Sequence, residues 1–144
     1  MSGEYLVRPL SEEDMPECIE LWKASEGVGL RPEEDLAFFL KFLKRNPGLS
    51  HCALDSANGR LIACALAGHD GKRGHLYHVA VKREWRGKGI GGAICKKCLA
   101  SLTAEGIERM AISVFADNEE ALRFWQKNGW TLREDLKSLT IFRH

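Results

Sequence analysis

Apolar positions recur along the chain with two different spacings, and each change of spacing marks the boundary of an expected element. A spacing of two residues predicts a strand, and a spacing of about 3.6 residues predicts a helix. Met15, Cys18, Ile19 and Trp22, for example, share one helix face. The expected strands cover residues 5–10, 50–55, 60–68, 76–81, 109–115, 130–134 and 137–142, and the expected helices begin near residues 14, 33, 90 and 118. This interleaving predicts an α/β fold, a mixed sheet of six to seven strands with helices on both faces.

Short local signals support these boundaries. Ser11 precedes Asp14 by three residues, as in a capping box at a helix start. Asn58-Gly59 is a strong signal for a hairpin between two strands. Gly106 is placed to end the helix that begins near residue 90.

Composition indicates an ordinary globular protein. The chain has 144 residues, 44% of them apolar and 28% charged, with a net charge of +1. This length predicts one domain over residues 1–144. Mixed charges do not favour a nucleic-acid or membrane surface. No apolar run reaches membrane-spanning length and the first residues lack signal-peptide features, so a cytoplasmic location is expected.

The five cysteines fit reduced thiols. Cys95 and Cys98 have the spacing of a redox or metal pair, but they fall inside an expected helix and no second pair accompanies them. Packing is the favoured interpretation, and no metal site is expected. No cysteine is a candidate nucleophile, because none lies in the glycine-rich stretch or on the strand before it.

The stretch from His75 to Gly92 carries the main chemical signal. A strand and a basic connector lead to Gly87, Gly89, Gly91 and Gly92, which open a helix. Such glycines let backbone N–H groups approach an anion closely, most often a phosphate. A P-loop is excluded because Ala93 and Ile94 follow Gly92 where Lys and Ser or Thr are needed. The glycines also match the dinucleotide-binding pattern G-x-G-x-x-G. That interpretation is not favoured, because five residues separate the first glycine from the strand, which the pattern should follow directly.

The remaining pattern, R-x-x-G-x-G, is filled by Arg86, Gly89 and Gly91. Three further stretches stand in matching order: Val7 to Leu10 leading to Asp14, Val79-Ala80-Val81, and Asn118 to Trp130. With these, nearly the whole chain resembles the GCN5-related N-acetyltransferase (GNAT) superfamily. The resemblance implies the acyl-CoA N-acyltransferase fold, with a largely antiparallel central sheet.

The resemblance also implies acetyl-CoA as the acyl carrier, with CoA as the product. Its pyrophosphate would lie on the backbone N–H groups from Gly87 to Gly92, with added charge from Arg86 and Lys88. The backbone of Val79 to Val81 would pair with the pantetheine arm. The carrier-binding residues expected in this way are Val79, Ala80, Val81, Arg86, Gly87, Lys88, Gly89, Ile90, Gly91, Gly92, Asn118 and Trp125.

Two of these residues, Asn118 and Trp125, share a face of the last expected helix. Asn118 is also suited to cap that helix. Trp125 departs from the family pattern, in which many relatives have a tyrosine that protonates the departing thiolate. An indole N–H donates a hydrogen bond but not a proton, so the acid role at Trp125 is in doubt.

Candidates for the proton acceptor lie on the strand before the glycines. Strict alternation sets His75 and Tyr77 on the face of Val79 and Val81, and His78 on the other face. His75 or Tyr77 is therefore the first choice for the base and His78 the second, although all three are equally consistent with ordinary sheet positions. Expected acceptor-binding residues are Glu26, Arg31 and Arg73.

The expected activity is direct acetyl transfer to a primary amine, with a small metabolite or amino-acid-like amine preferred as acceptor. A protein N-terminus or lysine is the alternative acceptor. A non-catalytic acyl-CoA-binding module and an interaction subunit are the alternative classes. A homodimer through the last strands, as in many relatives, is compatible with the sequence but not required by it.

Overall fold

The computed structural model describes residues 3–143. These residues form two compact units, the first ending at Ser113 and the second beginning at Val114. Within residues 3–143, no helix is both long and apolar enough to span a membrane.

The first unit contains a five-stranded sheet and three α-helices. The strands are β1 (Tyr5–Pro9), β2 (His51–Asp55), β3 (Leu61–His69), β4 (Gly74–Val81) and β5 (Met110–Ala111). The helices are α1 (Met15–Lys23), α2 (Leu36–Arg45) and α3 (Ile90–Ala104), with the short 3₁₀ helices η1 (Glu12–Asp14) and η2 (Arg83–Trp85).

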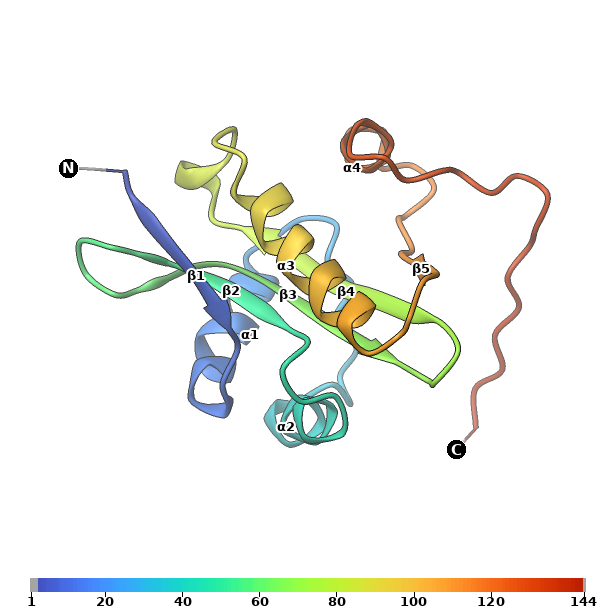
Figure 1. Cartoon of the computed structure of the whole chain (residues 1–144), viewed down its shortest axis with the longest axis horizontal. Helices are drawn as coiled ribbons and strands as arrows, with labels where there is room; N and C mark the ends of the chain where they lie inside the picture. Colours follow the sequence, from blue (N-terminus) through green and yellow to red (C-terminus); the bar gives the residue numbers. More distant parts are fainter. Residues whose placement is uncertain (1–2, 144) are drawn as a thin grey trace. The chain divides into compact units, whose positions relative to one another are not determined.

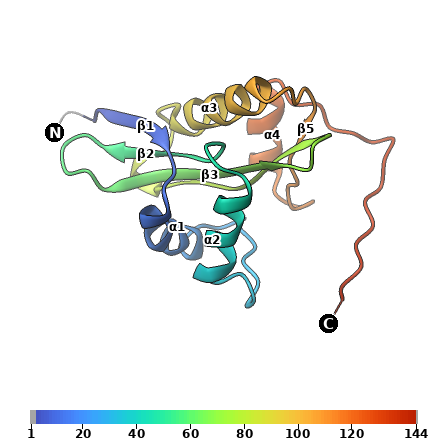
Figure 2. The same cartoon turned by 60° about the horizontal axis from the view of Figure 1, so that its bottom comes forward.

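The strands lie in the order β1-β2-β3-β4-β5. The first four pair antiparallel, and β5 runs parallel to β4. Helix α3 covers one face, and α1 and α2 cover the other (Figures 1 and 2). The prediction of a mixed, largely antiparallel sheet with helices on both faces is therefore confirmed.

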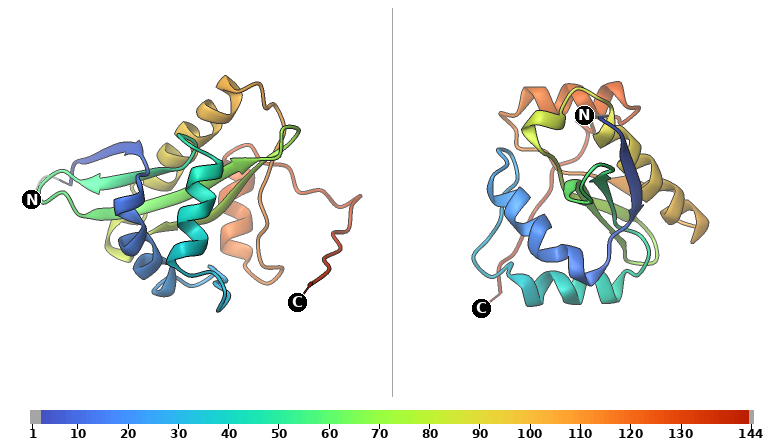
Figure 3. Two further views of the ribbon diagram at one scale, coloured as in Figure 1. Left: turned by 90° about the horizontal axis from the view of Figure 1, so that it is seen from below. Right: turned by 90° about the vertical axis from the view of Figure 1, so that its left-hand side faces the viewer.

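Strand β3 is the centre of the first unit, because its side chains are buried from Leu61 to Gly68. Figure 3 shows its long hairpin with β2 and the two helices that cross the same face. Cys64 and Leu66 of β3 pack in a core with Trp22 of α1 and Phe39 of α2. A Cβ on Gly74 would lie 3.0 Å from Leu102 of α3, so the sheet and α3 are in close contact.

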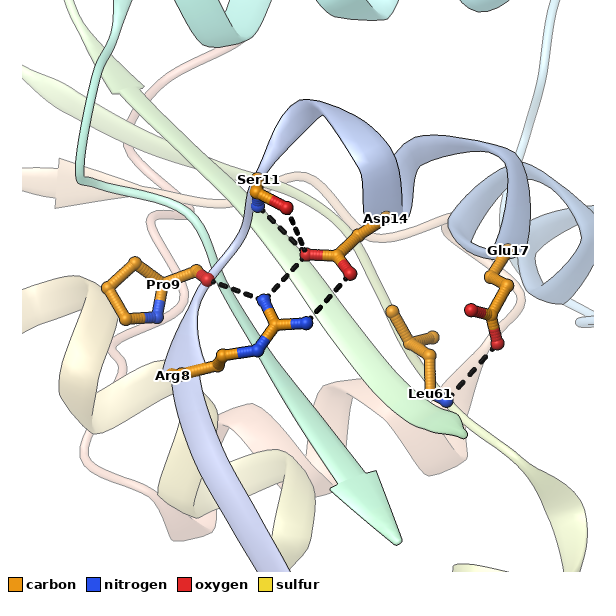
Figure 4. Close-up of polar contacts among 6 residues, drawn as sticks. All are labelled: Arg8, Pro9, Ser11, Asp14, Glu17 and Leu61. Carbon is orange, nitrogen blue, oxygen red and sulfur yellow. Dashed lines mark hydrogen bonds and ion pairs between the residues drawn. The ribbon is translucent and has the colours of Figure 1, made fainter. Parts of the chain in front are cut away.

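A bidentate ion pair between Arg8 and Asp14 joins β1 to the start of α1 (Figure 4). Together with Ser11, these residues form what we call the ion-paired corner. Arg8 donates to both carboxylate oxygens of Asp14, at 2.7 and 2.8 Å. The Ser11 N–H and hydroxyl donate to the same carboxylate, at 2.8 and 3.1 Å. Burial raises the pKa of Asp14, but the hydrogen bonds from Arg8 and Ser11 outweigh it and lower that pKa below its usual value. The capping box expected at Ser11 and Asp14 is therefore present.

The second unit contains helix α4 (Glu119–Lys127). The rings of Phe124 and Trp130 pack against Trp125 with centroids 5.0 and 5.4 Å away. The N–H of Trp130 donates to the carbonyl of Trp125 at 3.0 Å, which turns the chain back along the end of the helix.

The expected number of strands is not reached. The strand expected at 109–115 is reduced to Met110–Ala111, and the strands expected at 130–134 and 137–142 do not form within residues 3–143. Leu139 and Ile141 are 97% and 78% exposed. A strand requires backbone partners as well as an alternating pattern, and no strand pairing is formed at Leu139 or Ile141.

Candidate functional site

A glycine-rich loop, residues 86–92, follows η2 and includes the start of helix α3, and its residues 86–89 are exposed. Gly87 and Gly89 have φ of +80° and +81°, a backbone conformation that favours glycine. Gly89 is also the N-cap of α3. A Cβ built on either glycine would meet nothing within 4 Å. The glycines are thus required by backbone conformation, and the space above them is open.

The backbone N–H groups of this loop point to an anion site. The first hydrogen bond of α3 runs from the N–H of Ala93 to the carbonyl of Gly89, at 3.0 Å. Within residues 3–143, the N–H groups from Gly87 to Gly92 donate to no protein acceptor. Together with the partial positive charge at the start of this 15-residue helix, they favour a phosphate group.

Two residues of the loop carry a positive charge, Arg86 and Lys88. The Nε of Arg86 donates to the carbonyl of Val81 at 3.0 Å, which ties the loop to the end of β4. The ammonium of Lys88 lies 5.0 Å from the ring centroid of Trp85, a buried side chain of η2. Free N–H groups, two cations and open space together fit a diphosphate.

Strand β4 approaches this loop with one edge open. Its pairing with β5 covers only Gly74 and His75. No strand within residues 3–113 pairs with this edge from Leu76 to Val81. An extended ligand could therefore bind there by adding backbone hydrogen bonds.

A bulge interrupts β4 at His78. Leu66 of β3 pairs with Tyr77, and Cys64 pairs with Ala80, so β4 has one extra residue between the two pairs. His78 has a φ of +51°, the only positive φ of a non-glycine residue within residues 3–143. A bulge changes the direction of the side chains that follow it.

This bulge makes one prediction wrong, because His78 lies on the same face of the sheet as Tyr77. The ring of Tyr77 is 5.8 Å from that of Phe42 in α2. The ring of His78 is 5.2 Å from Trp22 in α1 and 5.8 Å from Phe39 in α2. All three contacts are with helices on one face of the sheet.

Beyond the bulge, Ala80 packs in the core formed with α1 and α2. Alternation then sets Val79 and Val81 on the opposite face. The predicted grouping of His75 and Tyr77 with Val79 and Val81 is therefore also wrong. The extra residue in β4 is the physical reason.

Tyr77 and His75 stay together. Their rings stack at 5.8 Å, and Tyr77 is 42% exposed. Partial burial, and to a smaller extent the Asp70 carboxylate, raise the pKa of Tyr77 above its usual value. Tyr77 is therefore protonated at neutral pH, where it can donate a hydrogen bond but is a poor base.

The residues expected to bind the acceptor occupy two segments. Glu26, in the loop between α1 and α2, pairs with Arg83 of η2 at 2.9 Å, and both are exposed. Arg31, in the same loop, lies 3.6 Å from Glu33. Arg73 is in the turn before β4, where its N–H donates to the Asp70 carboxylate at 2.8 Å. Within the first unit, the Glu26–Arg83 ion pair thus connects the α1–α2 loop with η2, which follows β4.

Sequence reasoning missed Glu34. This residue precedes α2, and its Oε2 lies 3.5 Å from Nε2 of His78. An acidic residue before a helix usually indicates a favourable helix start, so the local sequence gives no signal for a partner on β4.

In the second unit, Asn118 caps α4, and its Oδ1 accepts the N–H of Ala121 at 3.1 Å. Trp125, on the same helix, is buried. The capping role of Asn118 is confirmed, whereas the carrier contacts expected of Asn118 and Trp125 remain predictions.

All five cysteines are buried. Burial raises the pKa of Cys52, Cys95 and Cys98 to about 12. Such thiols stay protonated and are poor nucleophiles. The packing interpretation of Cys95 and Cys98 agrees with their burial in α3.

Solved structures of similar fold include acetyltransferases with different substrates. The NatC complex bound to Gag peptide and CoA has a TM-score of 0.78 and 21% identity, over 91% of this chain and 87% of that one. The ribosomal-protein-S18-alanine N-acetyltransferase from Escherichia coli has a TM-score of 0.73 and 18% identity, over 88% of this chain and 77% of that one. Glucosamine-6-phosphate N-acetyltransferase from Arabidopsis thaliana has a TM-score of 0.70 and 17% identity, over 98% of each chain. At these identities the likeness is one of fold.

A family model covers most of the chain. The model of the acetyltransferase (GNAT) family matches residues 15–130, a range that includes α1, the bulged strand, the glycine-rich loop and α4. The chain belongs to the GNAT family of acetyltransferases.

Proposed function

We propose that this protein is an N-acetyltransferase that moves an acetyl group from acetyl-CoA directly to a primary amine, as a single domain over residues 1–144. The observation that carries the proposal is the glycine-rich loop, where six consecutive backbone N–H groups have no protein acceptor within residues 3–143. These groups fit the pyrophosphate of CoA. The CoA reported with the NatC complex, which shares the fold, supports the same assignment.

Each part of the site has a defined task. The N–H groups from Gly87 to Gly92 and the charges of Arg86 and Lys88 bind the pyrophosphate. The open edge of β4 from Val79 to Val81 binds the pantetheine arm by backbone hydrogen bonds. In the second unit, Asn118 and Trp125 add contacts to the carrier.

When bound, the thioester of acetyl-CoA supplies the activated acetyl group. The protein must then bind the amine, take up its proton and hold the reacting groups together. An N–H near Val79 would donate to the thioester oxygen. Buried thiols with raised pKa do not suit a covalent intermediate on cysteine, so the amine attacks the thioester directly. The same reduced thiols support a cytoplasmic location.

A small amine is the preferred acceptor. The α1–α2 loop carries Glu26 and Arg31, and the turn before β4 carries Arg73. An arginine can bind a substrate carboxylate through two hydrogen bonds, and a glutamate can bind an ammonium group. Such a set suits an amino-acid-like molecule.

A non-catalytic acyl-CoA-binding module is the second candidate, and Trp125 is the observation that favours it. Its indole cannot give a proton to a leaving thiolate. Trp125→Tyr distinguishes the two functions. Turnover that rises on an amine panel indicates an enzyme lacking its acid, whereas intact binding with background turnover indicates a binding module.

The direct test is calorimetric titration with acetyl-CoA and with CoA. Wild-type protein is expected to bind both at micromolar concentration, and Gly89→Trp is expected to abolish binding by filling the loop. Gly59→Trp is the matched control, because Gly59 also has a positive φ (+72°) and open space, but lies in the turn between β2 and β3. Absence of binding in the wild type, or equal loss in both variants, would contradict the proposal.

A further inference from the structure

The positive φ of His78 suggests that its position matters for more than the fold. A non-glycine residue in the left-handed region is strained and persists only where surrounding contacts hold it. Such residues are concentrated at functional sites. In β4 this conformation coincides with the bulge, which puts the histidine on the same face as Tyr77.

Two helices hold His78 in place. The indole N–H of Trp22 donates to the His78 carbonyl, and its ring lies 5.2 Å from the imidazole. The ring of Phe39 lies 5.8 Å away, nearly perpendicular to the imidazole at 76°. Both aromatic residues are almost completely buried, so the imidazole has little freedom to turn.

Glu34 is the charged partner of this imidazole. Its Oε2 lies 3.5 Å from Nε2, and both side chains are only 16% exposed. The neighbouring carboxylates of the α1–α2 loop, Glu26 and Glu33, are mostly exposed. The other oxygen of Glu34 accepts the N–H of Arg31 at 3.0 Å, which fixes the carboxylate.

The second ring nitrogen of His78, Nδ1, is available to a ligand. Within residues 3–143 it makes no hydrogen bond, and no buried, unsatisfied side-chain nitrogen occurs there. Nδ1 is therefore not completely buried, and the His78 side chain is 16% exposed. In the neutral form whose proton is on Nε2, the nitrogen nearest Glu34, Nδ1 carries an acceptor lone pair.

We propose that His78 accepts the proton of the substrate amine at Nδ1, directly or through one water, and that Glu34 is its positioning residue. This inference rests on the proposed acetyl transfer. The substrate ammonium loses one proton to Nδ1 and becomes a neutral amine that can attack the thioester carbon. As the C–N bond forms the C–S bond breaks, and the leaving thiolate takes up the second proton of the nitrogen, which gives the amide and the free thiol. The imidazole becomes an imidazolium ion, whose charge the Glu34 carboxylate balances. The proton leaves to water after transfer.

The groups around His78 are compatible with this role. From α1 and α2 it meets the uncharged rings of Trp22 and Phe39. On β3, across the sheet, burial raises the pKa of Cys64 and keeps that thiol neutral. Tyr77, its neighbour on β4, is protonated at neutral pH. Within residues 3–143, Glu34 is thus the carboxylate that pairs with the imidazole.

The first test compares His78→Asn with wild type on an amine panel. Asparagine tolerates the left-handed backbone but cannot accept a proton at neutral pH. We expect kcat/KM to fall on the order of 10²-fold, and the decrease in kcat/KM at acidic pH to disappear. Calorimetry should show unchanged acetyl-CoA affinity. His69→Asn is the matched control, because His69 also pairs with a glutamate, Glu105, at 2.7 Å, and it should keep wild-type rates and pH profile.

The second test does not depend on turnover. Nitrogen-15 NMR of the free protein reports which ring nitrogen of each histidine carries the proton. We expect neutral His78 to hold the proton on Nε2 in the wild type, and a mixture of the two tautomers in Glu34→Gln. Glu105→Gln should leave the His78 signals unchanged.

The outcomes separate this inference from the proposed function. A wild type that binds no acetyl-CoA or acetylates no amine overturns the proposed function and this inference with it. The inference alone is overturned if the wild type acetylates an amine and His78→Asn folds, keeps the wild-type kcat/KM and shows the same decrease in kcat/KM at acidic pH. A proton on Nδ1 of neutral wild-type His78 also overturns it.

Discussion

The ion-paired corner and the glycine-rich loop are both polar parts of the first unit. The hydrogen-bonding groups of the corner have partners within the protein, whereas the backbone N–H groups of the loop do not. In the corner, the Asp14 carboxylate accepts four hydrogen bonds, two from Arg8 and two from Ser11. In the loop, the N–H groups from Gly87 to Gly92 have no acceptor within residues 3–143.

This difference separates a structural polar site from a proposed binding site. Satisfied groups stabilise the fold because their desolvation is compensated. Exposed N–H groups at a helix start add little to the fold, but they can bind an anion without rearrangement. Changes in the corner should therefore alter stability and not affinity, and changes in the loop should do the reverse.

The largest expected effect is on stability in the corner. Asp14→Ala removes hydrogen bonds to a charged group and leaves Arg8 without its carboxylate partner, so we expect a loss of about 2 kcal/mol in the free energy of unfolding. Urea denaturation measures this loss, and calorimetry should show acetyl-CoA affinity within twofold of wild type. A stable Asp14→Ala protein with weakened binding would remove the distinction between the two regions.

The same corner predicts a pH dependence. The pKa of Asp14 is lower in the folded protein than its usual value, so its ionised form favours folding. That contribution is complete above the unfolded-state value, near 3.9, and is lost as pH falls through the lower folded-state value. The stability difference between wild type and Asp14→Asn should therefore be constant from pH 5 to 7 and shrink below about pH 4. A difference that grows on acidification contradicts this sign.

A smaller effect distinguishes two glycines with the same conformation. Gly89→Ala and Gly59→Ala each put a Cβ on a backbone with positive φ and no nearby atoms. Each should cost about 1 kcal/mol in stability. Only Gly89→Ala should also weaken acetyl-CoA binding, because its Cβ enters the space above the loop. Equal affinities for the two variants would argue against a ligand at the loop.

The smallest expected effect concerns charge beside the loop. Lys88→Gln removes one cation near a proposed pyrophosphate, and we expect acetyl-CoA affinity to fall about threefold, in line with an exposed charge pair of under 1 kcal/mol. The loss should shrink in high salt, because mobile ions screen exposed charges. Lys72→Gln, in the turn between β3 and β4, is the control and should bind as wild type does.

Much of the first unit was predictable from local sequence. The capping box at Ser11 and Asp14, the hairpin near Gly59 and the glycine that ends α3 all occur where expected. These features depend on residues close together in the chain, and the backbone preferences of Gly, Ser and Asp are enough to specify them. The strands expected after residue 129 fail because strand formation depends on distant partners.

The sequence by itself determined the glycine-rich loop. The positive φ at Gly87 and Gly89 and the free N–H groups at the start of α3 follow from residues within one short stretch. Only the tertiary structure decided what surrounds His78. The register between β3 and β4 adds a residue at this position, so His78 lies on the face opposite to the one expected. Tertiary packing then brings Glu34, 44 residues earlier in the chain, next to it. A spacing of two residues cannot reveal a bulge, because the extra residue is defined by the partner strand.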